Sequence, residues 1–214
     1  MSGADAEARR EELVALYQEV SNCKKCPLHE TRTKTVFGAG NADADLMFVG
    51  EAPGAEEDRQ GLPFVGRAGQ LLNELLVEIG LSREDVFICN VLKSRPPNNR
   101  DPQPTEIAAC EPWLWGQVRL IEPRVVCTLG NFATKLLTGN PTGITRVRGV
   151  PPPHDLGGRT VHLLPLFHPA AALRTPAVKE QLRGDFATIP ALLRQPLPEP
   201  MPSAEEIAAA TAPE

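Results

Sequence analysis

The chain has 214 residues, of which 42% are hydrophobic, and a formal net charge of −5 at pH 7. This length suits one α/β domain with its own apolar core. No apolar run approaches the roughly 18 residues of a membrane-spanning helix, and the first ten residues lack the apolar centre of a signal peptide. We therefore expect a cytoplasmic protein whose five cysteines stay reduced, as metal ligands or core side chains.

The negative charge gathers at the carboxyl end of the chain. Residues 195–214 hold four Glu and no Lys or Arg, so 23 acidic and 22 basic side chains remain in the rest. A near-neutral body can carry a basic face, and the net charge therefore does not exclude a nucleic-acid partner. Because the end segment is rich in Pro, Ala and Glu, we expect a globular domain over residues 1–194 and a disordered tail over 195–214.

Strand-like and helix-like patterns alternate along the chain. In chain order we predict a helix at 6–20, a strand at 46–50, a helix at 68–79, a strand at 86–90, a helix at 106–121 capped by Thr105, a strand at 124–130, a helix at 131–137, a strand at 160–168 and a closing helix at 178–193. This alternation predicts a single-domain, three-layer α/β/α fold with a central four-stranded parallel sheet and right-handed crossovers.

The segment between the first predicted strand and the following helix is the most informative part of the chain. A structural connector needs two to six residues, and this one is far longer. It is rich in Gly and carboxylates and presents Phe64 between Gly61 and Gly66. Loops that leave the carboxyl ends of parallel strands build the sites of open α/β sheets, so we expect this loop to be functional.

Four loops follow the four predicted strands, and they carry Glu51 with Phe64, then Asn90, then Gly130-Asn131, and finally His168. An amide suits the reading of a base edge, a ring can stack on a planar ligand, and an imidazole can stabilise negative charge or move a proton. Each residue alone is more often structural, as a turn residue, a strand terminator or a core side chain. Their joint placement at strand ends favours a site.

Four segments resemble the signature segments of the family 4 uracil-DNA glycosylases, the iron–sulfur enzymes of bacteria and archaea: Gly50-Glu-Ala-Pro-Gly54, Gly61-Leu-Pro-Phe-Val-Gly66, Asn90-Val-Leu-Lys-Ser-Arg-Pro-Pro-Asn-Asn-Arg-Asp101 and His168-Pro-Ala-Ala-Ala-Leu-Arg174. The resemblance runs from about residue 23 to about residue 193. It implies a uracil-DNA glycosylase fold and a monofunctional hydrolase that cleaves the N-glycosidic bond of uracil and leaves an abasic site for base excision repair. Its partner is then uracil-containing DNA, and we expect a nucleoid-associated monomer without membrane contact.

The same resemblance assigns roles to single residues. Phe64 stacks on the flipped uracil, and Asn90 binds its amide edge. His168 donates to the uracil oxygen that gathers charge as the bond breaks, which is how a preorganised donor assists a leaving anion. Glu51 and the backbone around Ala52 lie against the base and the attacking water.

Further positions match the family at the rim of the site. Glu57 and Asp58 fill acidic motif positions near the mouth. Leu173 is the wedge that occupies the space vacated by the flipped nucleotide, because extrusion unstacks the duplex. Arg174, beside it, holds a phosphate.

The pair Cys23 and Cys26 by itself indicates a zinc knuckle, a cluster or a redox pair about equally. The family pattern adds two cysteines, of which Cys110 fills the last, whereas Ser94 stands at the third position. Fifteen residues lie between Ser94 and Cys110, so the spacing of the family is kept. The resemblance implies an iron–sulfur cluster, 4Fe-4S in type, that pins an N-terminal segment of about residues 5–35 to the loop at 93–104.

Several outcomes stay open at Ser94. In the first, the Ser94 hydroxyl ligates the iron. In the second, water or a small ligand occupies that iron, or a three-iron cluster forms. In the third, the cluster is absent, and in the fourth Cys89 takes the place of Ser94, which the position of Cys89 on a strand disfavours. Clusters normally use thiolates, so with three retained we expect a cluster that forms but is labile to oxygen. Cys127, within an apolar run, is expected in the core. Four basic residues around this segment are candidates for the DNA face or for a solvated loop: Lys24, Lys25, Arg95 and Arg100.

Three other functions compete with this one. A relative that traps uracil covalently carries an Arg-Arg-Ile-His type insertion where this chain has Arg95–Asp101, and the His is missing here. A catalytically inactive DNA-binding homologue is disfavoured by the intact Glu51, Asn90 and His168. A nucleotide hydrolase with Mg²⁺ on Glu57 and Asp58 has weak support, because the chain has no phosphate-binding loop, and we expect no nucleotide cofactor.

Overall fold

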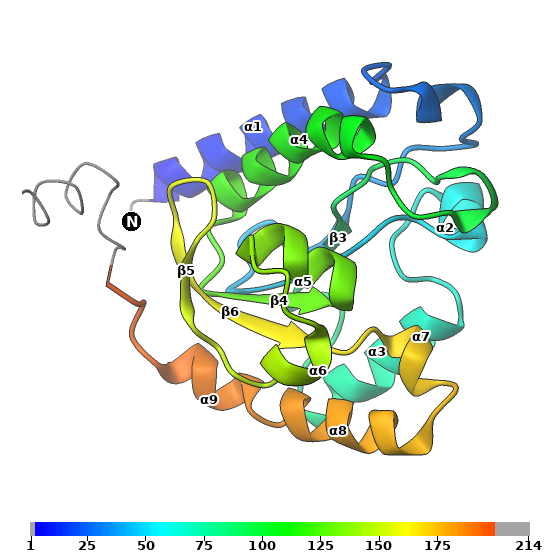
Figure 1. Cartoon of the computed structure of the whole chain (residues 1–214). Helices are drawn as coiled ribbons and strands as arrows, with labels where there is room; N and C mark the ends of the chain where they lie inside the picture. Colours follow the sequence, from blue (N-terminus) through cyan, green and yellow to red (C-terminus); the bar gives the residue numbers. More distant parts are fainter. Residues whose placement is uncertain (1–2, 200–214) are drawn as a thin grey trace, which may run out of the picture.

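A six-stranded sheet forms the middle layer of the computed structural model, which describes residues 3–199 (Figure 1). The strands lie in the order β1-β3-β2-β4-β6-β5. The inner four run parallel, whereas β1 and β5 pair antiparallel at the two edges. The strands are β1 (Ala39–Gly40), β2 (Leu46–Gly50), β3 (Phe87–Asn90), β4 (Val125–Leu129), β5 (Pro153–Asp155) and β6 (Thr160–Leu166).

The predicted four-stranded parallel sheet is confirmed for these inner strands. The two edge strands extend it to six, and neither has an apolar run that a sequence pattern would reveal. Strand β1 has two residues, and β5 begins with Pro153, a residue type that sheets tolerate at an edge.

Helices cover both faces of the sheet, so the predicted three layers are confirmed (Figure 1). Helices α1 (Gly3–Ser21) and α4 (Pro104–Ile121) pack together on one face. Helices α3 (Arg67–Glu78), α8 (Pro176–Phe186) and α9 (Ile189–Arg194) cover the other. The shorter helices are η1 (Pro27–Glu30), α2 (Ala55–Gln60), η2 (Pro97–Asn99), α5 (Asn131–Thr138), α6 (Ile144–Val147) and α7 (Pro169–Ala172).

The two apolar cores follow from the alternation of side chains along each strand. Met47 and Val49 of β2 belong to the core under α1 and α4. Leu46 and Phe48, on the opposite side of the same strand, belong to the core under α3 and α8. Both faces of β2 are therefore buried, which explains why the sequence at 46–50 is a continuous apolar run.

Three helix predictions differ from the structure. The closing helix at 178–193 is two helices, because Pro190 has no amide N–H and cannot continue the hydrogen-bond ladder of α8. Helix α4 begins earlier, at Pro104. Its cap is Gln103, which forms a reciprocal capping box with Glu106, and not Thr105. The long loop after β2 also contains α2, a helix of six residues.

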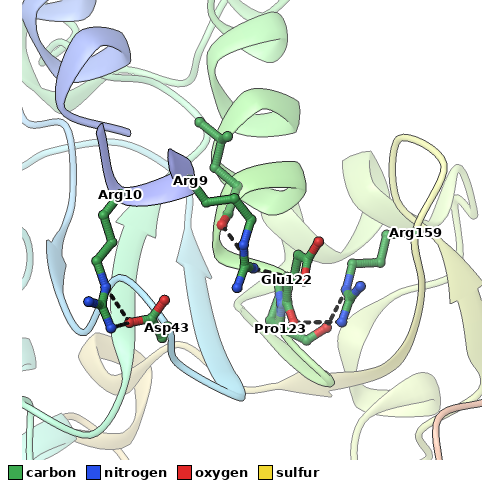
Figure 2. A network of polar contacts seen from close by, with 7 residues as sticks. Arg9, Arg10, Asp43, Glu122, Pro123 and Arg159 are labelled. Atoms are coloured by element: carbon green, nitrogen blue, oxygen red, sulfur yellow. Dashed lines mark hydrogen bonds and ion pairs between the residues drawn. The ribbon is translucent and has the colours of Figure 1, made fainter. Parts of the chain in front are cut away.

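Arginines fasten helix α1 and the end of α4 to the amino end of the sheet (Figure 2). Arg9 forms an ion pair with Glu122 at 2.7 Å, and Arg10 donates to Asp43 through Nε, also at 2.7 Å. Glu122 has a left-handed backbone, with φ of 56°. Arg159 donates to the carbonyl oxygens of Glu122 and Pro123, at 2.6 and 2.9 Å. This end of the sheet is thus a structural anchor, opposite the strand ends predicted to carry the site.

The predicted tail begins at residue 195, and residues 195–199 of it are described. The carbonyl of Gln195 accepts a bond from Arg124 at 2.5 Å, and that of Pro196 lies 2.9 Å from Nε2 of His162. Residues 200–214 of the predicted tail lie outside the described residues. Across residues 3–199, no helix is long and apolar enough to span a lipid bilayer.

Candidate active site

A cavity of about 310 Å³ opens where β2, β3 and β6 end. Six residues that the sequence assigned to catalysis or substrate binding line it: Glu51, Ala52, Glu57, Phe64, Asn90 and His168. They come from three separate parts of the chain, 51–64, 90 and 168, and meet because the carboxyl ends of the parallel strands lie at one edge of the sheet. The structure therefore brings the predicted site residues together, while their chemical roles stay predictions.

Gly50 makes room for the floor of this cavity. It stands opposite Asn90 in the register of β2 with β3. A Cβ at Gly50 would lie 2.3 Å from Oδ1 of Asn90 and 2.8 Å from the ring of Phe64. Only a residue without a side chain fits there, so the amide and the ring can both face one planar ligand.

Phe64 and His168 stand beside each other in the cavity wall. Their rings stack, with 5.6 Å between centroids and an interplanar angle of 30°. Phe64 lines the cavity although it is only 6% exposed, and it belongs to the core below α3. This placement fits stacking on a flat base.

His168 is held as a neutral hydrogen-bond donor. His168 is the N-cap residue of α7, and its Nδ1 accepts a hydrogen bond from the amide N–H of Ala170, with 3.1 Å between the two nitrogens. The ring proton of the neutral form then sits on Nε2. Burial lowers the pKa of His168 to about 4, against a smaller opposing effect of Glu57. The imidazole is therefore uncharged at pH 7, with Nε2–H free to donate.

Glu51 is a half-buried carboxyl group at the end of β2. Burial raises its pKa, and the negative charge of Asp101 raises it further. A carboxylate in such surroundings is a better proton acceptor than one in water. Asp101 was not a predicted site residue, because nothing in the sequence reveals its proximity to Glu51.

The two acidic residues predicted at the mouth behave differently. Glu57 lines the cavity, and its Oε1 accepts bonds from the amides of Val65 and Gly66, each at 3.0 Å. Asp58 is 5% exposed and accepts two bonds from the amide of Thr33, at 3.0 and 3.1 Å. The placement of Asp58 at the mouth is therefore wrong, because its carboxylate is turned inward to anchor the loop after η1.

A second cavity, of about 590 Å³, adjoins the first and shares Glu51 and His168 with it. Asn131 and Lys135 of α5 line its far side. Gly130 has φ of 95°, a conformation that favours glycine, and lets His168 approach the turn. Glu51 and His168 therefore stand between the two cavities and line both.

The predicted wedge and phosphate ligand lie just after α7. Leu173 is 39% exposed, and Arg174 next to it is also exposed. Ala170, from the same turn, lines the first cavity. Leu173 thus stands three residues from the cavity wall.

The predicted cluster ligands come from the turn before η1, the loop after β3, and α4. Cys110 is buried. Burial raises its pKa, and the charges of Cys26 and Cys23 raise it as well, so the three thiols lie within electrostatic reach of one another. Among residues 3–199 no three His, Cys, Asp or Glu side chains converge on a single metal ion. A cluster spreads its ligands over several irons, and three neighbouring thiols fit that donor set.

Ser94 is 3% exposed, and its Oγ accepts a hydrogen bond from Arg32 at 3.1 Å. The Ser94 hydroxyl thus has a charged hydrogen-bond donor in Arg32. Burial raises the pKa of Cys26, and the charge of Arg32 lowers it by a smaller amount. Cys89 is fully buried in β3, in the core under α1, and Cys127 is fully buried in β4. The expectation that Cys127 belongs to the core is confirmed.

The basic residues near these cysteines are mostly occupied within the protein. Lys25 Nζ lies 4.0 Å from the centroid of the Trp113 ring. Arg95 donates to Asn99 at 2.7 Å, and Arg100 donates to the buried Glu106 at 2.9 Å. Three of the four basic side chains thus contact other residues of the protein, whereas Lys24 is exposed, and the choice between a DNA face and a solvated loop stays a prediction.

Lys93 is a buried residue that no motif or spacing in the sequence singles out. It is 2% exposed, and Nζ donates to the carbonyl of Asn90 at 2.7 Å and to Oε1 of Gln117 at 2.6 Å. Burial lowers its pKa. Lysine is rarely buried, so only the tertiary structure identifies its place beneath Asn90.

Fold and site define an α/β protein whose parallel strands end at a cavity lined by a carboxylate, an aromatic ring, an amide and an imidazole. The family model described as uracil DNA glycosylase superfamily matches residues 37–187. The type-4 uracil-DNA glycosylase of Archaeoglobus fulgidus is 46% identical over 84% of this chain and 92% of its own length. That of Thermotoga maritima is 53% identical over 77% of this chain and 85% of its own length. The chain therefore belongs to the uracil DNA glycosylase superfamily and, within it, to the type-4 uracil-DNA glycosylases.

Proposed function

We propose that the cavity at the strand ends holds a uracil flipped out of DNA while the bond to its deoxyribose is hydrolysed. The protein is a uracil-DNA glycosylase, a hydrolase of N-glycosyl bonds in DNA repair. One observation carries the assignment of the site: Glu51, Phe64, Asn90 and His168 line one cavity at the ends of parallel strands. Uracil-containing DNA is the substrate.

Recognition of the base is assigned to Phe64 and Asn90. The ring stacks on the face of the pyrimidine. The amide of Asn90 offers a donor and an acceptor to the N3–H and O4 edge of uracil, whereas cytosine presents the opposite pattern there. Asn90 is 2% exposed, and its Oδ1 lies close against Gly50. A wrong base would therefore leave a buried polar group unpaired.

Departure of the base is assigned to His168. When the C1′–N1 bond breaks, the electron pair stays on N1 of uracil and its charge spreads to O2. Nε2–H of the neutral imidazole donates to that oxygen and needs no proton transfer to do so. A preorganised donor of this kind stabilises the transition state more than the ground state.

Hydrolysis is completed by water at C1′, next to Glu51. The carboxylate orients the water and takes one of its protons as the new C1′–O bond forms. Glu51 then gives this proton up to solvent and the uracil anion takes one from solvent, so the products are uracil and an abasic site. The raised pKa of Glu51 supports this role as a proton acceptor. We propose a monofunctional reaction, because no lysine is among the described residues that line the 310 Å³ cavity proposed to hold the uracil.

The path of the DNA strand is assigned to the surfaces around the two cavities. We propose that Leu173 fills the gap in the duplex, with Arg174 on a backbone phosphate. The second cavity, lined by Asn131 and Lys135, has the polarity and position for the neighbouring phosphate. This path keeps the sugar above Glu51 and His168.

An iron–sulfur cluster is proposed at Cys23, Cys26 and Cys110, with Ser94 at the fourth position. Bound there, such a group supplies structural cross-linking rather than a step of the hydrolysis. The three residues belong to the turn before η1 and to α4, which frame the loop that contributes Pro96, Asn99 and Arg100 to the cavity wall. The cysteines would therefore fix that wall.

The test is an excision assay on oligonucleotides with uracil in single strands and in U·G and U·A pairs, with thymine and cytosine as controls. Release of uracil, with strand breaks appearing only after alkali, is expected. Asn90→Ala should lower the rate and also the discrimination against cytosine. Intact uracil under all conditions would refute the function, and breaks without alkali would refute the monofunctional part.

A further inference from the structure

Phe64 has a backbone conformation that bulky residues rarely adopt. Its φ is 51°, in the left-handed region, although it is neither Gly nor Asn. A residue keeps such a conformation only where the surrounding structure holds it. Because Phe64 lines the cavity, the groups that hold its backbone also set the direction of its ring.

Two charged side chains hold the backbone on either side of Phe64. Arg83, in the loop between α3 and β3, donates to the carbonyl of Phe64 at 2.9 Å and to that of Pro63 at 2.6 Å. Glu57 accepts the amides of Val65 and Gly66 at 3.0 Å. The guanidinium of Arg83 thus donates to the carbonyls at and before Phe64, and the carboxylate of Glu57 accepts from the amides that follow it.

The position of Arg83 is itself fixed. Its Nη1 also donates to Oδ1 of Asn73 on α3, at 3.2 Å. Gly69 of the same helix lies against the Phe64 carbonyl, and a Cβ there would stand 1.7 Å from that oxygen. Helix α3 therefore provides both the space for the strained turn and the support for the arginine that holds it.

We propose that Arg83 is a positioning residue that holds Phe64 in the conformation required to stack on the uracil. The inference rests on the stacking role proposed for Phe64. Arg83 does not line the cavity and acts through the ring, so it is not a catalytic residue. Its contribution to the reaction should vanish when the ring is absent.

The chain contains a matched control at the opposite end of the sheet. Arg159 makes the same kind of contact there, to the carbonyls of Glu122 and Pro123 (Figure 2). Glu122 is also a left-handed residue without the freedom of glycine, with φ of 56°. Both arginines are partly buried. Replacing Arg159 removes an equivalent structural clamp and leaves the cavity untouched.

The experiment compares Arg83→Gln with Arg159→Gln in the full chain. We expect both variants to lose thermal stability. Only Arg83→Gln should weaken inhibition by free uracil and slow single-turnover excision, roughly 10- to 100-fold, as a misplaced binding group does. If Arg83→Gln does not fold, Arg83→Lys replaces it, because lysine keeps the charge but lacks the rigid planar fork whose two nitrogens reach the carbonyls of Phe64 and Pro63. Equal excision rates in wild type and the Arg83 variant would overturn the inference.

The same substitutions in a Phe64→Ala background separate this inference from the proposed function. We expect Arg83→Gln to lower stability there but to leave the already reduced excision rate unchanged. A further loss of rate would show that Arg83 acts by another route and would overturn the inference. If Phe64→Ala alone changes neither uracil inhibition nor excision, the stacking role itself fails.

Discussion

The amide N–H of Ala170 donates a hydrogen bond to Nδ1 of His168, with 3.1 Å between the two nitrogens. The bond selects the tautomer that carries its proton on Nε2, and burial keeps the ring uncharged by lowering its pKa to about 4. The site therefore offers a neutral donor to the departing base. A charged imidazolium would have to lose the bond to Ala170.

This geometry predicts a rate that does not follow the usual titration of histidine. Single-turnover excision should be flat from about pH 8 to about pH 6, because His168 is neutral throughout that range. His168→Ala should slow excision on the order of 10²-fold or more, with binding to abasic DNA much less affected. A rate that rises as an ordinary histidine gains its proton would contradict the neutral donor.

The fall of the excision rate at low pH, the acid limb of the pH profile, should follow the protonation of Glu51. Its carboxyl pKa is raised above the ordinary 4.5, so the carboxylate gains a proton, and excision is lost, at a higher pH than for a free glutamate. Asp101→Asn removes one of the two causes and should move the limb to lower pH. Glu84→Gln, at an exposed site away from the cavity, should leave the limb in place and serves as the control. An unchanged limb in Asp101→Asn would disprove the coupling.

Gly50→Ala should fill the floor of the cavity. The added Cβ would meet Oδ1 of Asn90 at 2.3 Å and the Phe64 ring at 2.8 Å, and one of the two groups has to move. We expect a loss of excision on the order of 10²-fold, with a fold that persists by circular dichroism. Normal activity would mean that the amide and the ring do not need their observed positions.

Gly69→Ala is expected to separate helix propensity from the geometry of the site. Alanine favours a helix over glycine by about 1 kcal/mol. At Gly69, however, the Cβ would lie 1.7 Å from the Phe64 carbonyl oxygen, so both stability and excision should fall. Gly184→Ala in α8 is the control, because a Cβ there meets nothing within 4 Å and should only stabilise. Equal behaviour of the two variants would count against the tight contact.

Ser94→Cys should raise the iron content to about four per chain and slow the bleaching of the protein in air, because thiolates are the usual cluster ligands. Cys127→Ala, in the core of β4, should leave the iron content unchanged. Iron analysis and the visible absorbance spectrum measure both, without any assay of activity. The same iron content and air stability with Ser or Cys at position 94 would show that it is not a ligand position.

Much of the fold could be predicted, because a strand that is buried on both faces of the sheet has a continuous run of apolar residues. The runs at 46–50 and 86–90 are continuous and apolar, and they are the inner strands β2 and β3. Edge strand β1 has two residues and one buried face at most, so no periodicity reveals it. The break between α8 and α9 is not predicted, because Pro190 is a single residue within an otherwise helical pattern of apolar positions.

The sequence by itself determined the family and the identities of the residues at the strand ends, because Glu51, Phe64, Asn90 and His168 stand in local motifs that need no long-range information. Only the tertiary structure decided how these residues are held. Arg83 and Asp101 act on Phe64 and Glu51 across the fold, and the tautomer of His168 depends on one amide of α7. Hydrogen bonds and charges act over a few ångströms in space, whatever the separation in the chain, so a pattern of neighbours in sequence cannot contain them.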